Sequence, residues 1–347
     1  LPGMPKATID DVAELAGVSI KTVSRVVNRE PNVREETREK VENAIARLNY
    51  RPNKAAQNLA SHQSRLIVLI YDDPSAYEIP SAGFIIRMQQ GALRACRTAN
   101  YELLIHPCRY RNKNVAAELR TLIEQVRPDG IVLAAPLSNV QRVVDAIEAT
   151  GTPLIRVSPG KANGNSLYVA TNDREISCEM TRYLAGLGHK RIAFIKGNPG
   201  HKAVGNRFLG YQDGLAQSGL QACDELVIKG DNSIRSGEAA ALTLLQKDNR
   251  PTAIFAANDD MAAGVMRVAD RLGIKVPDQL SVVGCDDIAL AQQIYPALTT
   301  INQPLTQMSE AAVLMLIESK RNKKHPDSPT IVPGTLKIRE STAAARD

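Results

Sequence analysis

The sequence lacks the features of a membrane-spanning, secreted or zinc-binding chain. Its 347 residues include no Trp, four Phe and five Cys. The longest apolar runs, such as residues 66–71, have the length of a strand and fall far below the roughly 20 apolar residues of a membrane helix. No apolar segment follows Leu1, so we expect no signal peptide and a cytoplasmic chain. The Cys residues are scattered and never form a C-x-x-C pair, which predicts reduced thiols and no metal site.

Common catalytic motifs are also missing. A G-x-G at residues 186–188 lacks the third glycine of a dinucleotide loop, because Arg191 stands in its place. Two glycines in residues 200–205 are spaced as in a P-loop, but Asn206 stands where that loop needs Lys. Neither G-x-S-x-G nor H-E-x-x-H occurs. We therefore expect no enzyme and no cofactor.

Charge is unevenly distributed along a chain long enough for two or three domains. Hydrophobic residues make up 44% and charged residues 23%, as in ordinary folded proteins. The net charge is +6, yet residues 1–65 hold 11 Lys and Arg against 8 Asp and Glu, which is half of the excess. This concentration favours a polyanionic partner for the N-terminal end.

Residues 7–50 contain no strand-like run and predict three short helices, at 10–17, 20–28 and 34–48. Pro31 separates the second helix from the third. Thr8 and Ser19 are suitable N-caps. We expect the small residues before Val18 to let two helices approach closely at a tight turn. The apolar residues expected to face inward are Val12, Leu15, Val23, Val26, Val27, Val41, Ile45 and Leu48.

The second of these helices leaves a polar face outward at its N-terminal half. The outward residues are Ile20, Lys21, Thr22, Ser24 and Arg25. This is the arrangement of a recognition helix, whose first turns meet base edges in the major groove. Lys21 and Arg25 could donate to guanine, and the hydroxyl groups could hold phosphates. A small helical subdomain with a solvated face is the alternative.

A polar linker at 51–65 precedes a long alternation of strands and helices. Strands are predicted at 66–71, 101–105, 130–135, 153–157, 191–196, 226–229, 252–257 and 281–285. Amphipathic helices are predicted at 83–98, 115–126, 176–187, 206–218, 237–246 and 261–272. Such alternation predicts parallel sheets covered on both faces, and about nine strands suggest two doubly wound α/β lobes.

The turn A-G-V-S at 16–19, the S-x-x-T-V-S-R core that follows and the linker resemble the lactose-repressor/galactose-repressor family, and the resemblance extends over the whole chain. It implies an all-α helix-turn-helix head plus an α/β core with lobes of the periplasmic-binding-protein type. It also implies that the linker forms a hinge helix on DNA, where Leu59 wedges into the minor groove. The implied DNA contacts are Thr8, Ser19, Ile20, Lys21, Thr22, Ser24, Arg25, Asn28 and Leu59.

The resemblance also implies domain boundaries. The head spans residues 1–50, the hinge 51–65 and the core 66–347. Because the lobes exchange chain segments, the N-lobe is expected at about 66–168 and 300–328. The C-lobe is expected at about 169–299 and 329–341.

Three further matches imply a ligand site at strand ends, where doubly wound sheets bind ligands. The segments 206–214, 256–264 and 281–301 resemble family motifs that place Arg207, Asn258 and Asp286 in the pocket. A guanidinium, an amide and a carboxylate together suit the neighbouring hydroxyl groups of a sugar. A buried Arg207–Asp286 ion pair and a helix cap by Asn258 are the structural alternatives. Weaker candidates by alignment are Asp73, Tyr77, Asp173, His201 and Asn232.

Two positions depart from the family pattern. Relatives commonly carry an aromatic residue where this chain has Asn232, and Tyr or Phe where it has Cys285. We therefore expect less aromatic stacking on a sugar face and a more polar pocket.

Taken together, these features predict a transcription regulator, a repressor of a carbohydrate-utilisation operon. A sugar or sugar derivative between the lobes would control it allosterically. The chain ends without the leucine heptad helix of tetrameric relatives, which favours a homodimer on a palindromic operator of roughly 14 to 20 base pairs. A purine- or nucleoside-responsive regulator is the alternative, and a sugar-binding protein without DNA function is less favoured.

Overall fold

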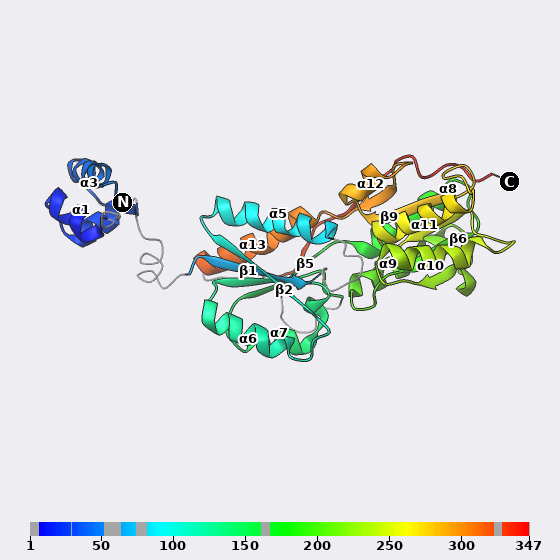
Figure 1. The fold of residues 1–347 in the computed structure, drawn as a ribbon, viewed down its shortest axis with the longest axis horizontal. Coiled ribbons are helices and arrows are strands. Elements are labelled where there is room, and N and C mark those ends of the chain that lie inside the picture. The colour runs from blue at the N-terminus through cyan, green and yellow to red at the C-terminus, as the bar shows by residue number, and fades with distance from the viewer. Residues whose placement is uncertain are drawn as a thin grey trace, which may run out of the picture. The chain divides into compact units, whose positions relative to one another are not determined.

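The computed structural model describes residues 7–28, 30–51, 64–73, 82–160, 167–322 and 328–346. It divides into two compact units, Leu1–Ser64 and Arg65–Asp347, which are taken separately below (Figure 1). Leu59 and Tyr77 lie outside the described residues, as does most of the linker. No helix in the described ranges is long and apolar enough to cross a membrane.

The first unit contains α1 (Ile9–Ala16), α2 (Ile20–Val27) and α3 (Glu35–Leu48). Thr8 begins α1 with a capping box, because its hydroxyl accepts from the Asp11 N–H at 3.3 Å while its own N–H donates to the Asp11 carboxylate at 2.7 Å. Gly17 ends α1 at φ +66°, a left-handed conformation that glycine adopts without strain. Ser19 then caps α2, accepting from the Thr22 N–H at 3.2 Å.

The three helices of this unit share one small core. Val12, Val23 and Val41, one from each helix, are fully buried. Leu15, which the sequence placed on the same inner face, is 41% exposed instead. The inner face of α1 consists of Ile9, Val12, Ala13 and Ala16, at i, i+3, i+4 and i+7 spacing, so Leu15 lies at the edge of this stripe and faces solvent.

The second unit contains two six-stranded sheets, which define two lobes. The N-lobe sheet has the order β11-β5-β4-β3-β1-β2 and the C-lobe sheet the order β12-β10-β9-β8-β6-β7. Every pairing is parallel except that of β10 with β12. The expected fold class is therefore confirmed. The described residues form more strands than the nine expected, since short edge strands complete both sheets.

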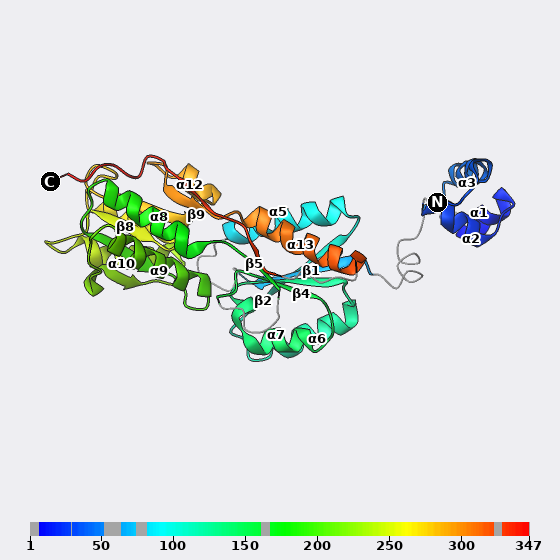
Figure 2. The ribbon, with the colours of Figure 1, turned by 180° about the vertical axis from the view of Figure 1, so that it is seen from behind.

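The N-lobe sheet consists of β1 (Leu66–Asp72), β2 (Glu102–Cys108), β3 (Gly130–Ala134), β4 (Leu154–Val157), β5 (Tyr168–Ala170) and β11 (Thr330–Ile331). Helices α5 (Gly83–Thr98) and α13 (Leu305–Asn322) cover one face, and α6 (Val115–Val126) and α7 (Gln141–Glu148) cover the other (Figure 2). Alternate residues of β1 enter the two cores: Ile67 and Leu69 face α5 and α13, whereas Val68 and Ile70 face α6 and α7. Burial on both faces explains the uninterrupted apolar run of this strand.

The C-lobe sheet consists of β6 (Ile192–Lys196), β7 (Val227–Lys229), β8 (Ala253–Ala256), β9 (Ser281–Asp286), β10 (Thr299–Asn302) and β12 (Thr335–Lys337). Its helices are α8 (Asp173–Gly186), α9 (Lys202–Gln217), α10 (Ile234–Leu245), α11 (Asp259–Arg271) and the short α12 (Ala289–Gln293). Helix α8 packs against α9 and α10 against α11 (Figure 1). One continuous core joins these elements, with Phe194, Tyr211 and Phe255 fully buried.

The chain passes between the lobes three times, after β5, after β10 and after β11. The crossings lie a few residues beyond the boundaries expected from the sequence. Residues 300–302 pair within the C-lobe sheet although they were expected in the N-lobe. Residues 330–331 pair with β5 in the N-lobe sheet although they were expected in the C-lobe. The strand pairing at each crossing therefore extends one lobe's sheet into the segment that connects the lobes.

Close packing of α5 on α13 requires glycine at position 91. A Cβ atom there would lie 2.0 Å from the backbone oxygen of Thr306. We expect Gly91→Ala to lower the free energy of unfolding by about 1–3 kcal/mol, as overpacking of a core does. Gly205→Ala, on the open side of α9 with nothing within 4 Å, should raise it slightly. Urea unfolding of both variants checks this prediction, and equal stability of the two would contradict it.

Candidate functional site

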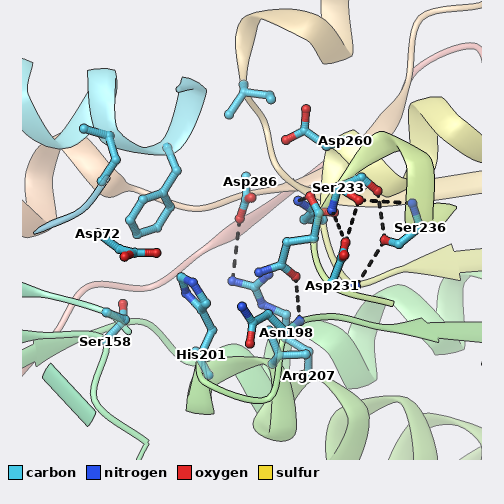
Figure 3. A pocket seen from close by; sticks show the side chains of 18 of the residues that line it. Asp72, Ser158, Asn198, His201, Arg207, Asp231, Ser233, Ser236, Asp260 and Asp286 are labelled. Atoms are coloured by element: carbon cyan, nitrogen blue, oxygen red, sulfur yellow. Dashed lines mark hydrogen bonds and ion pairs between the residues drawn. The ribbon is translucent and has the colours of Figure 1, made fainter. Parts of the chain in front are cut away.

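A cavity of about 670 Å³ opens between the lobes at the carboxyl ends of the strands. Asp72 and Ser158 of the N-lobe face Arg207, Asp231 and Asp286 of the C-lobe across it (Figure 3). The other polar and aromatic lining residues are Phe84, Arg111, Asn198, His201, Asn232, Ser233, Arg235, Ser236, Asn258, Asp260 and Gln303. The cavity size lies within the range of small-molecule sites.

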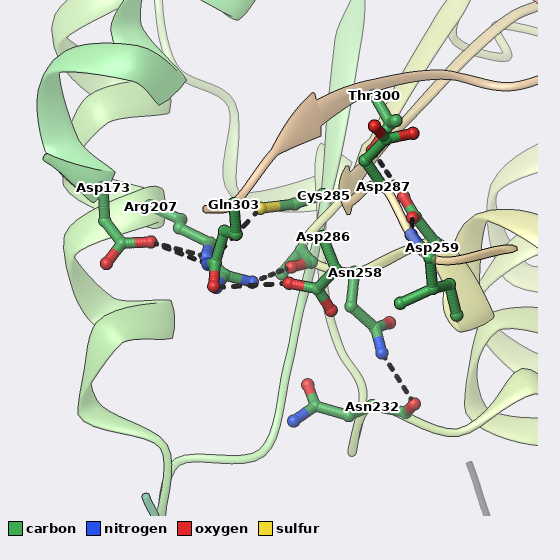
Figure 4. A network of polar contacts seen from close by, with 12 residues as sticks. Asp173, Arg207, Asn232, Asn258, Asp259, Cys285, Asp286, Asp287, Thr300 and Gln303 are labelled. Carbon is green, nitrogen blue, oxygen red and sulfur yellow. Dashed lines mark hydrogen bonds and ion pairs between the residues drawn. The ribbon is translucent and has the colours of Figure 1, made fainter. Parts of the chain in front are cut away.

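Arg207 of α9 lies at the centre of the polar network and is only 6% exposed (Figure 4). Its Nε donates to Asp173 Oδ1 at 2.9 Å and its Nη1 donates to the Ala257 carbonyl at 2.5 Å. Its Nη2 lies 3.6 Å from Asp286 Oδ1, which is near enough for charge attraction but too far for a hydrogen bond. The guanidinium is therefore hydrogen-bonded to Asp173 and the Ala257 carbonyl, whereas its contact with Asp286 is a charge attraction without a hydrogen bond.

Asp286 is the last residue of β9 and is 7% exposed. Its Oδ1 has no hydrogen-bond partner among the described residues, which is costly for a buried carboxylate. Burial raises the pKa of Asp286 to about 8, although the charge of Arg207 acts in the opposite direction. Its φ of +121° is one that residues with a side chain rarely adopt. Strain, burial and an unused acceptor therefore coincide in a residue that lines the cavity.

Asn258 caps α11, as one of the structural alternatives anticipated. Its Oδ1 accepts from the Met261 N–H at 3.0 Å, and its Nδ2 donates to the Asn232 carbonyl at 2.9 Å (Figure 4). The Asn232 side chain in turn accepts from the Asn198 N–H at 3.1 Å. Both amides therefore hold the wall in place, and each lines the cavity as well.

His201 lies at the N-terminal end of α9 and lines the cavity. Burial, with a smaller contribution from the charge of Arg207, lowers the pKa of His201 to about 4. The imidazole is therefore neutral near pH 7, with one nitrogen that donates and one that accepts. Such a ring can bind a hydroxyl group without adding charge to the site.

Two of the weaker candidates are placed differently from the sequence prediction. Asp72 lines the cavity in place of Asp73, whose N–H donates to the Cys108 carbonyl at 2.6 Å. Successive residues at a strand end point to opposite sides, so only one of the pair can face the cavity. Asp173 lies behind Arg207 rather than in the wall, and also accepts from Gln303 at 3.3 Å. Its role is to hold the guanidinium.

One aromatic ring lines the cavity, from a position outside the sequence motifs. Phe84, near the start of α5, lines the cavity and supplies a ring. Cys285 does not line it; the thiol lies 3.8 Å from the Gln303 amide, on the Asp173 side of the network. The sequence signal for Phe84 was weak, because it belongs to no motif and lies in a helix of the other lobe.

The head presents part of the predicted DNA-binding set. Ile20, Lys21 and Arg25 are exposed on α2, and Ile20 is 48% exposed, which is high for a large apolar residue. Other members of the set have local partners: Thr8 and Ser19 cap helices, and the Asn28 amide donates to Ser24 at 3.4 Å. The Arg25 guanidinium lies 3.6 Å from Glu30, an exposed pair of the kind that contributes little to stability.

The chain combines a helical head, which exposes a helix of the recognition type, with two sheets that enclose a cavity lined in part by charged and amide side chains. This combination defines a DNA-binding transcription regulator with a ligand-binding core. Residues 8–53 match the family described as bacterial regulatory proteins, lacI family. Residues 181–342 match the periplasmic binding protein-like domain.

Full-length relatives agree with these matches. The chain is 33% identical over 338 residues to the transcriptional regulator GalR of Escherichia coli (strain K12), covering 97% of this chain and 96% of GalR. The chain therefore belongs to the lacI family of bacterial regulatory proteins, as its motifs indicated.

Two solved structures are similar over nearly the whole chain. One is the lac repressor dimer bound to operator and the anti-inducer ONPF, with a TM-score of 0.80, 28% identity and coverage of 98% of this chain and 100% of that one. The other is a complex of the regulator CelR with cellobiose, with a TM-score of 0.74, 28% identity and coverage of 96% and 99%.

The raised pKa of Asp286 predicts a pH dependence of stability. Because the folded-state pKa of about 8 lies above the ordinary value of 3.8, the folded chain holds the proton more tightly than the unfolded chain. Raising the pH between these two values therefore lowers the free energy of unfolding. Asp286→Asn cannot ionise and lacks this contribution.

We expect the wild type to lose more stability than Asp286→Asn between about pH 5 and about pH 9, measured by urea unfolding. The other ionisable groups are the same in both chains, so Asp286→Asn serves as the control for the wild type. Equal losses would show that Arg207 already keeps Asp286 ionised at the lower pH.

Proposed function

We propose that this chain is a homodimeric repressor of a carbohydrate-utilisation operon. Helix α2 of each subunit reads one half of a palindromic operator. A neutral sugar or sugar derivative in the cavity between the lobes controls operator affinity. The proposed site of action is the cytoplasm, and no catalytic step is proposed.

The observation that carries the effector assignment is that Asp286 and Arg207 line the same cavity side by side. A carboxyl group and a guanidinium group that line the same cavity suit a ligand that offers adjacent hydroxyl groups. One hydroxyl group can donate to Asp286 while its neighbour accepts from Arg207. The ring of Phe84 can cover an apolar face of the same sugar.

The charges of the wall favour a neutral ligand. Acidic and basic residues both line the cavity, namely Asp72, Asp231, Asp260 and Asp286 together with Arg111, Arg207 and Arg235. Arg207, the most deeply placed of the cations, already has Asp173 as a partner. A phosphate would therefore lie close to these carboxylates, while the most buried cation already pairs with Asp173. The similarity to CelR, solved with cellobiose, supports a sugar.

The N-lobe surface supports the proposed homodimer. Ile86 and Leu93 lie two turns apart on α5 and are 48% and 38% exposed, and Ile105 on the edge strand β2 is 40% exposed. Helix α5 packs beside β2, so the three side chains belong to one region of the lobe. Burying them against a second copy would remove apolar area from water. The similar lac repressor structure is a dimer on its operator.

A ligand can control DNA binding only if it binds one arrangement of the lobes better than another. The cavity is built from both lobes, so its occupant contacts both. In the proposed mechanism, a change in lobe arrangement alters the spacing of the two linkers in the dimer. Operator affinity changes because both heads can no longer reach their half-sites together.

The DNA-binding part of the proposal predicts a base-specific role for Arg25. An operator is first selected from random duplex DNA with the wild-type chain. Arg25→Ala should then lower affinity for it by about 1–3 kcal/mol and relax the choice of base at one position in each half-site. Fluorescence anisotropy with selected and scrambled duplexes measures both effects.

Arg120→Ala, on α6 of the core, removes the same charge from an exposed pair with Glu124 and serves as the control. It should leave the ratio of specific to non-specific affinity unchanged. If the ratio is also unchanged in Arg25→Ala, the proposal that α2 reads bases through Arg25 is wrong.

The effector part predicts a thermal shift with neutral sugars. At 100 times its dissociation constant, a ligand adds about 2.7 kcal/mol, which raises the melting temperature by a few degrees. The panel consists of neutral mono- and disaccharides, sugar phosphates, purines and nucleosides. Asp286→Asn should abolish the shift. Stabilisation by purines or phosphates alone would overturn the sugar assignment while leaving the regulator in place.

A further inference from the structure

A single side chain of the N-lobe holds the backbone at the end of β9 in the C-lobe. Arg87 of α5 donates from Nη1 to the Asp286 carbonyl at 2.8 Å and to the Asp287 carbonyl at 3.0 Å. The same nitrogen thus binds two successive peptide oxygens of the other lobe. One of these residues carries the carboxylate that lines the cavity.

The backbone that Arg87 binds is strained. Asp286 has a φ of +121° and Asp287 a φ of +54°, and neither is glycine. Such conformations persist only where the surroundings hold them. This local geometry turns the two adjacent carbonyl groups toward the same cation, Arg87.

Other groups of the C-lobe hold the rest of this turn. The Asp287 carboxylate pairs with Arg339 at 2.5 Å and accepts from the Asn302 amide at 2.7 Å. The Ile288 N–H donates to Asp259 at 3.0 Å. These contacts fix the side chain of Asp287 and the following peptide, whereas the carbonyl groups of Asp286 and Asp287 are bound from the N-lobe.

The backbone of Arg87 is tied to its own lobe. The Thr306 hydroxyl donates to the Arg87 carbonyl at 3.3 Å, which ties this turn of α5 to the start of α13. One turn earlier, a Cβ atom on Gly83 would lie 2.9 Å from Ile288, so the helix approaches the same C-lobe turn closely. A displacement of the C-lobe turn therefore acts directly on the α5–α13 layer.

We infer that Arg87 is a positioning residue that couples the arrangement of the two lobes to the backbone of Asp286. With the contact made, the lobes stay closed on this side of the cavity and the Asp286 carboxylate keeps its orientation. With the contact broken, the C-lobe turn moves away from α5. An occupant that binds Asp286 acts on the same residue whose carbonyl Arg87 holds, which gives the site a direct mechanical link to the N-lobe.

The test measures the distance between the lobes in the full-length chain without any ligand or DNA. Nitroxide labels are placed on the exposed positions Gln125 of α6 and Gln217 of α9, each changed to Cys. The partly exposed Cys178 and Cys223 are changed to Ser. Labelled chain is diluted with unlabelled chain so that pulsed electron resonance reports distances within one subunit.

Arg87→Met removes both donated hydrogen bonds and keeps a long stem. It should shift the distance distribution away from that of the wild type and broaden it. Arg87→Lys, which retains a cation able to donate to both carbonyl groups, should restore the wild-type distribution at least in part. Arg94→Met, two turns later on α5 in an exposed pair with Glu310, is the matched control and should leave the distribution unchanged.

A wild-type distribution in folded Arg87→Met would overturn the inference, and so would an equal shift in Arg94→Met. A loss of melting temperature without a change in distance would show that Arg87 only stabilises the fold. If Arg87→Met does not fold, Arg87→Gln, whose short amide cannot reach the carbonyl groups, is judged by the same criterion. Because no sugar or operator enters the measurement, its outcome is independent of the proposed function.

Discussion

The buried guanidinium of Arg207 is the group around which the C-lobe wall of the cavity is organised. Burying a cation is costly unless charged and polar partners surround it. Asp173 from α8, the Ala257 carbonyl after β8 and Asp286 at the end of β9 provide those partners. Three separate elements of the C-lobe therefore converge on one side chain, and the wall of the cavity follows from that convergence. Asp286 Oδ1 has no hydrogen-bond partner among the described residues, so the carboxyl group is the least satisfied member of this convergence.

Strand order explains why such a site forms between the lobes. Both sheets are nearly all parallel, so the carboxyl ends of their strands and the helix N-termini gather at one edge of each lobe. The chain crosses between the lobes three times, which keeps those edges facing each other. Polar contacts on the rim, above all that of Arg87 with the β9 turn, then join the lobes around the cavity. In the proposed mechanism, ligand recognition and lobe arrangement would therefore depend on the same few peptides.

Much of this could be predicted from the sequence, and the exceptions have physical causes. The helices at 83–98 and 115–126 were predicted with their observed bounds, because their apolar residues follow a clear helical period. Strands β5, β11 and β12, of two or three residues, are too short to show a period. The motifs identified Arg207 and Asp286. They could not show Asp173 as the partner of Arg207, or Phe84 in the wall, since these contacts join distant segments. Whether Asp72 or Asp73 faces the cavity depends on where β1 ends to within one residue, which the sequence pattern does not show.

The central claim is that a neutral sugar bound beside Arg207 and Asp286 changes the affinity of the protein for its operator. The most direct measurement follows operator binding by fluorescence anisotropy while a stabilising neutral sugar is added, for the wild type and for Asp286→Asn. The account predicts a saturable change in operator affinity for the wild type and none for Asp286→Asn, with operator affinity in the absence of sugar retained by the variant. A wild-type affinity that does not respond to a sugar that binds, or an equal response in Asp286→Asn, would contradict it.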